Sequence, residues 1–180
     1  MAIPHAFLEA LPSSDRAPEL SHEDDLFGYL IGSWELEAVL YSANGEIRTS
    51  KGELHASRVL EGRAIQDLFI FPRRADRRSG TPTHGDRYAT TIRTLDRTLN
   101  AWRVYFINPA ADETSPQLIA RRVGNDIVME GTLRDGASIR WRYAAITATS
   151  FHYTAEKLQQ DGSCWRPYLE LFGTRVINDD

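Results

Sequence analysis

Cysteine is nearly absent from this 180-residue sequence. Its one cysteine, Cys164, stands beside Trp165 at an expected turn, and a single cysteine excludes a disulfide within the chain. No partner triad is apparent, so we interpret Cys164 as a bystander rather than a nucleophile. The N-terminus also lacks a basic segment followed by a long apolar run, the pattern of a secretory signal. These features favour a cytoplasmic protein of bacterial type.

Long apolar runs and an excess of positive charge are absent as well. No run approaches the roughly 20 residues that a transmembrane helix needs. The formal net charge is −4, which disfavours a general nucleic-acid-binding protein. We therefore expect no membrane and no nucleic acid among its partners.

The common catalytic and nucleotide-binding motifs are missing too. The sequence has no G-x-S-x-G, P-loop or G-x-G-x-x-G, which disfavours nucleophile-elbow hydrolases, NTPases and Rossmann oxidoreductases. Its five histidines show no H-x-H or H-x-x-x-H spacing, so we expect no metal site. We also expect no cofactor, with one minor alternative, a heme held by a single axial histidine, His55 or His152.

What is present is an ordinary composition, with 42% hydrophobic and 26% charged residues. Residues 1–20 are rich in Pro, Ser and Ala and are expected to form an extended arm, and residues 21–177 a single domain. Ser21 and Asp24 resemble a capping box. Four apolar residues then recur at helical spacing and predict a short helix over 22–31: Leu26, Phe27, Leu30 and Ile31.

After residue 32 the hydrophobic period changes to two, and turn dipeptides such as Asn44-Gly45 separate short β-rich runs. Consecutive strands with tight turns form a meander, and closing it removes exposed edges. The sequence therefore predicts an all-β fold, a single up-and-down antiparallel β-barrel of eight to ten strands, with the short N-terminal helix closing one end. The expected strands are 33–42, 46–58, 62–71, 86–95, 99–108, 117–123, 126–133, 137–146, 150–158 and 164–176.

One loop is unusually long and basic. Residues 72–87 carry five arginines. They are either a solvated loop or a flap over the barrel mouth that favours anionic ligands.

Turn positions give a register for the C-terminal half of the sheet. A two-residue turn at Asp135-Gly136 pairs Glu130 with Trp141, and a four-residue turn at 147–150 pairs Trp141 with Glu156. The face that this register turns inward is mostly apolar. It comprises Ile119, Arg121, Val123, Val128, Ile139, Trp141, Tyr143, Leu158, Trp165, Leu169 and Leu171.

The same register turns ionisable groups inward: Arg121, Glu130, His152 and Glu156. Buried charge is costly unless it is paired. Either Arg121 neutralises one carboxylate and the others lie near the wet rim, or the four anchor a ligand in an apolar pocket. In the second case Glu130, His152 and Glu156 are candidate general acids or bases. Burial among aromatic residues would raise a carboxyl pKa as such catalysis requires.

The candidate ligand-binding residues are Arg93, Trp102, Arg121, Trp141, Tyr143 and Trp165. A four-residue turn at 96–99 places Arg93 opposite Trp102. Inside the barrel, this pair would stack and could hold a carboxylate or an enolate. Outside, Arg93 would merely cover the indole.

The stretch Gly32-x-Trp34 opens the first expected strand. Because the last strand of a closed barrel returns beside the first, Arg175 should meet Trp34. A guanidinium over an indole is worth about 0.5–2 kcal/mol, and its donors can bond carbonyls at the closed end. We predict that this pair plugs the barrel floor.

G-x-W near the start with a late arginine resembles the calycin (lipocalin-like) arrangement. Segments 91–109 and 126–175 further resemble a DUF1579-type family of uncharacterised, calycin-like bacterial proteins. The resemblance implies the barrel fold and no particular reaction, and Tyr153 departs from it where tryptophan is commoner. The matching residues are Arg93, Asp96, Trp102, Asn108, Pro109, Glu130, Arg140, Trp141, Phe151, Tyr153, Glu156, Trp165 and Arg175.

Three functions remain open at this point. The first is a barrel that binds a small apolar or aromatic molecule with an anionic group. The second is a cofactor-free lyase, isomerase or cyclase that uses the interior Glu and His groups. The third is a structural homodimer whose barrel is filled by its own side chains.

Overall fold

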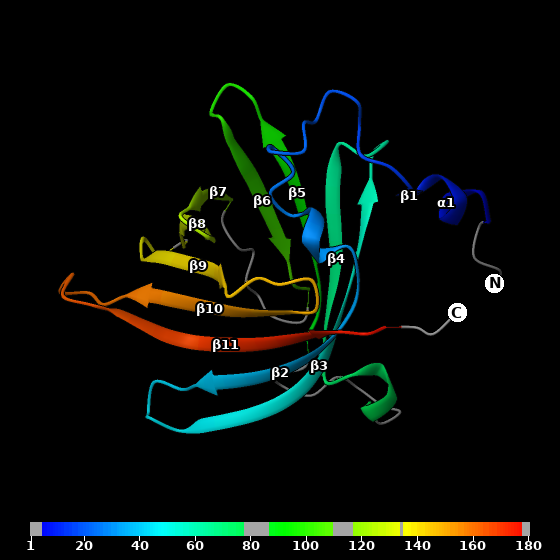
Figure 1. The fold of residues 1–180 in the computed structure, drawn as a ribbon. Helices are drawn as coiled ribbons and strands as arrows, with labels where there is room; N and C mark the ends of the chain where they lie inside the picture. The colour runs from blue at the N-terminus through cyan, green and yellow to red at the C-terminus, as the bar shows by residue number, and fades with distance from the viewer. Residues whose placement is uncertain (1–4, 78–86, 110–116, 134, 178–180) are drawn as a thin grey trace.

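The computed structural model describes residues 5–77, 87–109, 117–133 and 135–177, and its main feature is a closed β-barrel (Figure 1). Ten antiparallel strands follow one another around the barrel, and pairing of the last with the first and of the second with the third completes the ring. The strands are β2 (Gly32–Tyr41), β3 (Ile47–Val59), β4 (Ala64–Phe71), β5 (Arg87–Asp96), β6 (Ala101–Ile107), β7 (Leu118–Val123), β8 (Asp126–Thr132), β9 (Ser138–Ala144), β10 (Ser150–Leu158) and β11 (Trp165–Arg175).

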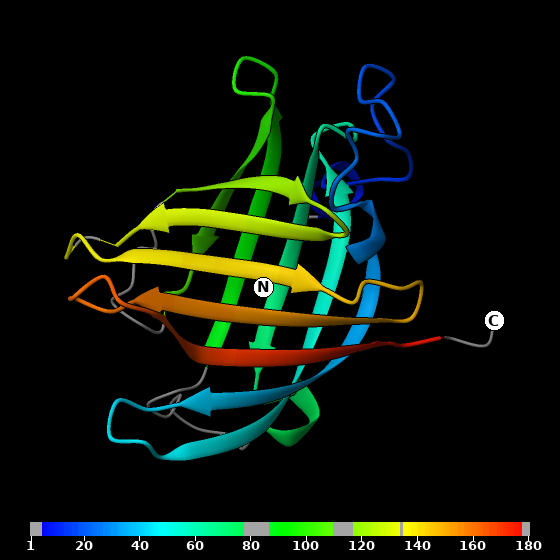
Figure 2. The ribbon, with the colours of Figure 1, turned by 60° about the vertical axis from the view of Figure 1, so that its left-hand side comes forward.

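The predicted fold class is therefore confirmed. Each observed strand coincides with an expected one to within about two residues at each end. The strands of β8 to β11 cross in front of those of β4 to β6 at a steep angle (Figure 2). Alternate residues of both walls point into the space between them, where the hydrophobic core lies.

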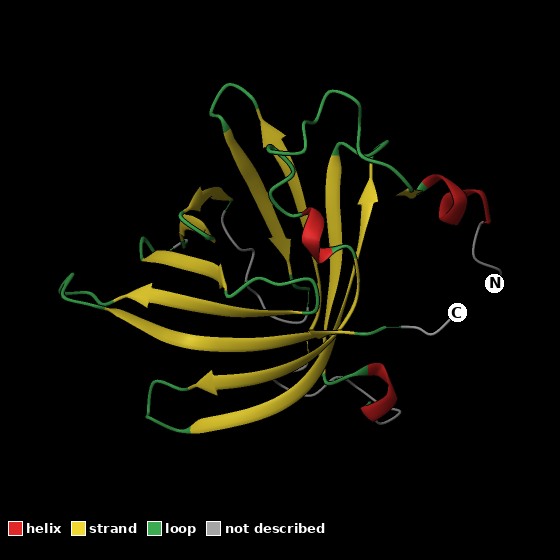
Figure 3. Ribbon diagram, viewed as in Figure 1, coloured by secondary structure: helices red, strands yellow, loops and turns green. Residues whose placement is uncertain are grey.

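The N-terminal segment adds two short elements outside the barrel (Figure 3). Helix α1 (His5–Ala10) has no buried residue. Strand β1 (Pro12–Ser13) pairs with Val59 and Arg58 of β3, beyond the point where β3 stops pairing with β2. A helix and a strand thus lie within the segment expected to be an extended arm.

The helix expected over 22–31 is much shorter. Only η1 (Gly28–Leu30), one turn of 3-10 helix, is helical. Ser21 and Asp24 do make the capping contacts, with 2.7 Å between Ser21 Oγ and Asp24 Oδ2. However, the Asp24 carbonyl accepts a hydrogen bond from the Trp102 indole at 2.9 Å, so it is not used as in an α-helix. Packing against the barrel end therefore overrides helix propensity.

This segment nevertheless closes one end of the barrel. Phe27 and Leu30 are completely buried. The Phe27 ring packs edge-on against Trp102, with 5.5 Å between the ring centroids. We call residues 22–31 the plug. The apolar spacing that predicted a helix thus identified the plug and its buried residues.

The predicted contact between Trp34 and Arg175 at the closed end of the barrel is also confirmed. Arg175 lies opposite Trp34 across β11 and β2, and its guanidinium stands 4.2 Å from the centre of the indole. Arg175 donates to the carbonyls of Tyr29, Ile31 and Ala148 at 2.5–2.6 Å. Gly32 has a φ of +117°, and a Cβ there would lie 2.8 Å from Arg175 Nη1, so glycine suits both the turn and the close approach.

The described part of the long basic loop lies on the outside of the barrel. Element η2 (Arg74–Asp76) is held against β3, where the Arg74 backbone and Nε both donate to Glu53 Oε1 at 2.8 Å. The rest of the loop, residues 78–86, falls outside the described residues, so the interpretation of 72–87 as a flap stays a prediction.

The Glu53–Arg74 contact predicts acid sensitivity. Hydrogen bonds from Arg74 lower the pKa of Glu53 to about 2, although burial opposes them. Because the folded-state pKa is depressed, the stabilisation is present above the ordinary carboxyl pKa and is lost as pH falls from about 5 to 2. We expect Glu53→Gln to cost about 1–2 kcal/mol at pH 7 and nothing near pH 2, since Arg74 is half exposed.

Urea unfolding of the wild type and the variant between pH 2 and 7 measures this effect. Glu35→Gln is the matched control, because the Glu35 side chain is 67% exposed. An acid slope for Glu53→Gln that equals that of the wild type would contradict the prediction.

Candidate functional site

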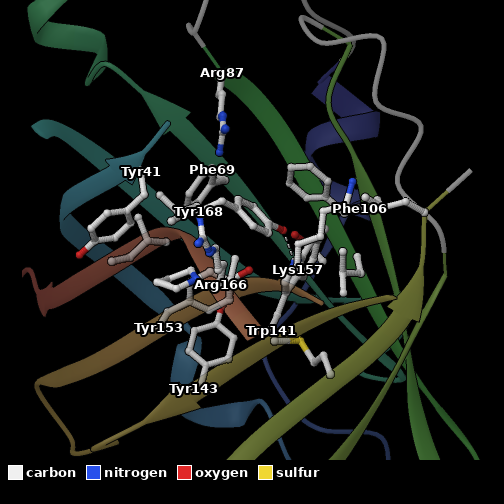
Figure 4. Close-up of a pocket in the computed structure, with 18 of the residues that line it drawn as sticks. Tyr41, Phe69, Arg87, Phe106, Trp141, Tyr143, Tyr153, Lys157, Arg166 and Tyr168 are labelled. Atoms are coloured by element: carbon white, nitrogen blue, oxygen red, sulfur yellow. Dashed lines mark hydrogen bonds between the residues drawn. The ribbon is translucent and has the colours of Figure 1, made fainter. Parts of the chain in front are cut away.

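The barrel encloses a cavity of about 550 Å³ (Figure 4). It lies toward the end of the barrel where β2 ends and β11 begins, and its size is in the range of small-molecule sites. The lining residues include Tyr41, Leu54, Asp67, Phe69, Arg87, Thr91, Arg93, Phe106, Met129, Leu133, Ile139, Trp141, Tyr143, Tyr153, Ala155, Lys157, Arg166, Pro167, Tyr168, Leu169 and Leu171.

Aromatic rings form much of the cavity wall. Trp141 packs edge-on against Phe106 with 5.5 Å between ring centroids, and Tyr143 lies 4.9 Å from Tyr153. The Trp141 indole donates a 2.6 Å hydrogen bond to the Tyr168 hydroxyl. These contacts fix the rings from four strands, so they form one continuous aromatic wall.

Charged side chains in the lining are mostly cations. Arg87, Lys157 and Arg166 lie at the mouth, where Lys157 also contacts Asp135 at 2.9 Å. Deeper inside, Arg93 forms an ion pair with Asp67, with 2.6 Å between Nη2 and Oδ2. Because Asp67 neutralises Arg93, the excess of positive charge is confined to the mouth.

The Asp67–Arg93 pair is almost completely buried, at 2% and 3% side-chain exposure. Asp67 Oδ1 also accepts a hydrogen bond from the Thr91 backbone at 3.2 Å. The Arg93 guanidinium lies over the Phe27 ring, and its Nε and Nη1 have no hydrogen-bond partner among the described residues. Burial lowers the pKa of Arg93, but the charge of Asp67 outweighs it, so the pKa rises and Arg93 stays charged.

The tyrosine hydroxyls near this pair remain protonated. Burial raises the pKa of Tyr143 to about 12, although the charge and a hydrogen bond of Arg93 oppose the shift. Burial also raises the pKa of Tyr153 well above its usual value. Both groups are therefore neutral hydroxyls at physiological pH.

The structure places three of the predicted ligand-binding residues in the cavity lining: Arg93, Trp141 and Tyr143. Trp102 is buried next to the plug, as its bond to Asp24 shows. Arg93 pairs across the strands with Val104 rather than with Trp102, so the expected stacked pair does not form. The turn after β5 begins one residue later than expected, because Asp96 still pairs with Ala101.

The remaining predicted site residues were wrongly placed inside the barrel. Glu156 faces outward and pairs with Arg140 at 2.8 Å, and His152 faces outward and contacts Glu170 at 2.8 Å. Glu130 is exposed opposite Arg140. The proposed acid–base set, Glu130, His152 and Glu156, therefore does not line the cavity.

Two candidate binding residues are also outside. Trp165 lies under the Arg140 guanidinium, with 4.4 Å from that carbon to the ring centre. Arg121 is exposed on β7 and lies on the outer face, opposite Val128 of β8. Neither residue lines the cavity.

Single-residue shifts explain these errors. Leu133 donates to Ala137 at 2.8 Å, so the turn between β8 and β9 has three residues rather than two. After β9, the turn bond from Thr147 to Ser150 is where expected, but Ala145 has a φ of +48° and adds one residue to the strand. A bulge at Ala155/Glu156 shifts β11 as well. Each shift reverses the inward and outward faces.

Sequence reasoning missed several cavity residues, among them Asp67, Tyr153 and Ala155, and it placed Lys157 and Arg166 on the outer face, although both line the cavity. Asp67 interrupts the apolar run of β4 at the same parity as Ile65 and Phe69, which are both buried. A lone acid at an inward position of such a strand is the signal that predicts a buried partner.

The heme alternative does not fit this cavity. His55 lies on the outer face, bonded to Ser33 and Glu53, and His152 lies outside as well. Neither histidine lines the cavity. Within the described ranges, no group of three or more His, Cys, Asp or Glu side chains is arranged to hold a metal ion. No helix in these ranges is long and apolar enough to cross a membrane.

Solved structures share this fold. Rv2717c from M. tuberculosis matches with 15% sequence identity and a TM-score of 0.56, over 91% of this chain and 100% of that one. The S-type phycobiliprotein lyase CPES from Guillardia theta matches with 10% identity and a TM-score of 0.58, over 87% and 94%. At such identities the likeness concerns the fold alone.

Sequence comparisons add no family. No protein-family model matches the chain, and no curated protein matches it. The resemblance to the DUF1579-type family therefore stays a prediction.

Proposed function

We propose that the barrel binds a small apolar or aromatic molecule that carries an anionic group. The observation that carries this proposal is the 550 Å³ cavity with aromatic walls and a cationic mouth. Apolar walls with a few placed polar groups are typical of small-molecule sites. An anionic group would find Arg87, Lys157 and Arg166 where solvent screening is incomplete.

The other two functions receive less support. Acid–base catalysis loses the residues suggested for it, since Glu130, His152 and Glu156 lie outside the cavity. A barrel filled by its own side chains would leave no such cavity. The proposal includes no cofactor, and it holds for a monomer or a homodimer because one chain supplies the whole lining.

Filling the cavity tests the proposal. Ala155 lies within the lining and is 1% exposed. We expect Ala155→Phe to occupy part of the cavity and to weaken binding of the neutral dye Nile red at least tenfold, while the barrel still folds. The measurement is a fluorescence titration, with circular dichroism as the check on folding.

Thr154→Phe is the matched control, because Thr154 is the neighbouring residue on β10 and faces outward opposite Glu170. It should bind Nile red as the wild type does. Equal binding by Ala155→Phe and the wild type would place the dye elsewhere and overturn the proposal. So would a wild-type protein that neither binds the dye nor carries a small molecule in native mass spectrometry.

A further inference from the structure

The polar groups of the cavity differ between its mouth and its floor. The mouth has three cations, one of which, Lys157, is paired with Asp135, so an excess of positive charge remains there. The cavity floor has the ion pair Asp67–Arg93, whose charges cancel. A full negative charge moved to the floor would lose its hydration without gaining a net opposite charge. An anionic group therefore suits the mouth, and a neutral group suits the floor.

The floor does not offer the unpaired nitrogens of Arg93. Its Nε and Nη1 are buried beneath surrounding atoms and closed off from the cavity. The Tyr29 hydroxyl is buried without a partner in the same way, and its ring packs against Tyr143 with 5.9 Å between centroids. None of these three atoms can reach a ligand in this conformation.

The Tyr143 hydroxyl belongs to the lining that a ligand can reach. Tyr143 lines the cavity together with Arg93, whose positive charge acts on the hydroxyl. A cation attracts the oxygen of a hydroxyl group and repels its hydrogen, so the oxygen is directed toward Arg93. Its own hydrogen is then left for another acceptor, and no described residue is seen to supply one.

We propose that the ligand places its anionic group at the mouth and a neutral hydrogen-bond acceptor, such as a carbonyl oxygen, at the floor, where it accepts the Tyr143 hydroxyl proton. This inference rests on the proposed function and adds the polarity and orientation of the ligand. Arg93 acts as a positioning residue, since its charge orients the Tyr143 hydroxyl, and Asp67 holds Arg93 in place through their ion pair. The aromatic wall then packs along the body of the ligand.

Two probes that differ only by one carbonyl test the inference. They are 4-(4-acetylphenyl)butanoate and 4-(4-ethylphenyl)butanoate, which share the carboxylate and the ring. We expect the wild type to bind the acetyl probe about tenfold more tightly, because the ethyl probe leaves the hydroxyl unpaired. Isothermal titration calorimetry gives both affinities.

Three variants assign the effect. Tyr143→Phe removes only the hydroxyl and should bring the two affinities within about twofold. Tyr153→Phe removes another hydroxyl of the lining and should keep the preference between the probes, whatever it does to the two affinities. The double variant Lys157→Met/Arg166→Met should weaken both probes equally and reduce the salt dependence of binding.

Several results would overturn the inference. They are equal affinities in the wild type, a preference that survives Tyr143→Phe, or a preference that Tyr153→Phe abolishes. A carboxylate bound at the floor would also overturn it, and would show as no loss in the mouth variant. Failure of the proposed function looks different, because neither probe nor Nile red would then bind to the wild type.

Discussion

Replacing Asp67 with asparagine is expected to lower the free energy of unfolding by about 3–5 kcal/mol. The variant keeps the shape of the side chain but leaves the Arg93 guanidinium charged and 3% exposed, without its counter-ion. Arg93 does not escape by losing its proton, because a guanidinium group stays charged in proteins even without a counter-ion. Urea unfolding at pH 7 measures the loss.

The pair itself should contribute much less than this loss suggests. Nε and Nη1 of Arg93 already lack partners, so the pair recovers only part of the cost of taking both ions out of water. We therefore expect Asp67→Leu/Arg93→Met to lie within about 2 kcal/mol of the wild type. Recovery is incomplete because the Thr91 backbone N–H loses Asp67 as its acceptor.

Comparing the single and double variants tests whether Asp67 and Arg93 are energetically coupled. If Asp67→Leu/Arg93→Met loses as much stability as Asp67→Leu and Arg93→Met added together, Asp67 and Arg93 are not coupled and the argument fails. A loss below about 1 kcal/mol in Asp67→Asn would show that water reaches Arg93 and screens its charge.

The sequence was sufficient for the strands and the floor because both depend on local signals. Turn dipeptides mark where strands end, so all ten strands of the barrel were predicted. Trp34 and Arg175 meet because the first and last strands of a closed barrel are neighbours, whatever the registers between them. Trp141 and Tyr143 were placed inward correctly for a similar reason, since β9 alternates clearly between apolar and basic residues.

The prediction of which residues of β8 and β10 face inward was wrong, because it followed registers counted from turn lengths rather than the hydrophobic alternation of each strand. On β10, Phe151 and Tyr153 share one face while His152 and Glu156 share the other, and the structure buries the aromatic face. The alternation alone would have given the correct answer. Bulges such as the one at Ala155 carry no reliable sequence signal, so registers counted from turns accumulate errors of one residue.

The Asp67–Arg93 pair lay beyond sequence reasoning for a different reason. The two residues are on neighbouring strands, but they are not direct cross-strand partners, since Asp67 pairs with Thr91. They are diagonal neighbours on the inner face, and the long arginine side chain spans the distance between them. Arg93 was singled out from the sequence, whereas its partner was not.

Replacing Trp34 with alanine is expected to cost about 3–5 kcal/mol, because a fully buried indole leaves a large cavity. The indole packs against Phe151 with 4.9 Å between ring centroids and donates to the Leu30 carbonyl at 2.7 Å. Trp34→Phe, which keeps a ring and loses the donor, should cost about half as much. Thermal and urea unfolding measure both variants.

Arg175→Met should cost about 2–4 kcal/mol by leaving the carbonyls of Tyr29 and Ile31 without their charged donor. Trp34 holds the intervening carbonyl of Leu30, so both side chains fix the same three residues of the plug. Once either side chain is removed, these three residues are already less fixed, so the remaining side chain contributes less to stability. The double variant should therefore lose at least about 1 kcal/mol less than the sum of the single losses. Strict additivity would mean that the plug does not depend on this pair.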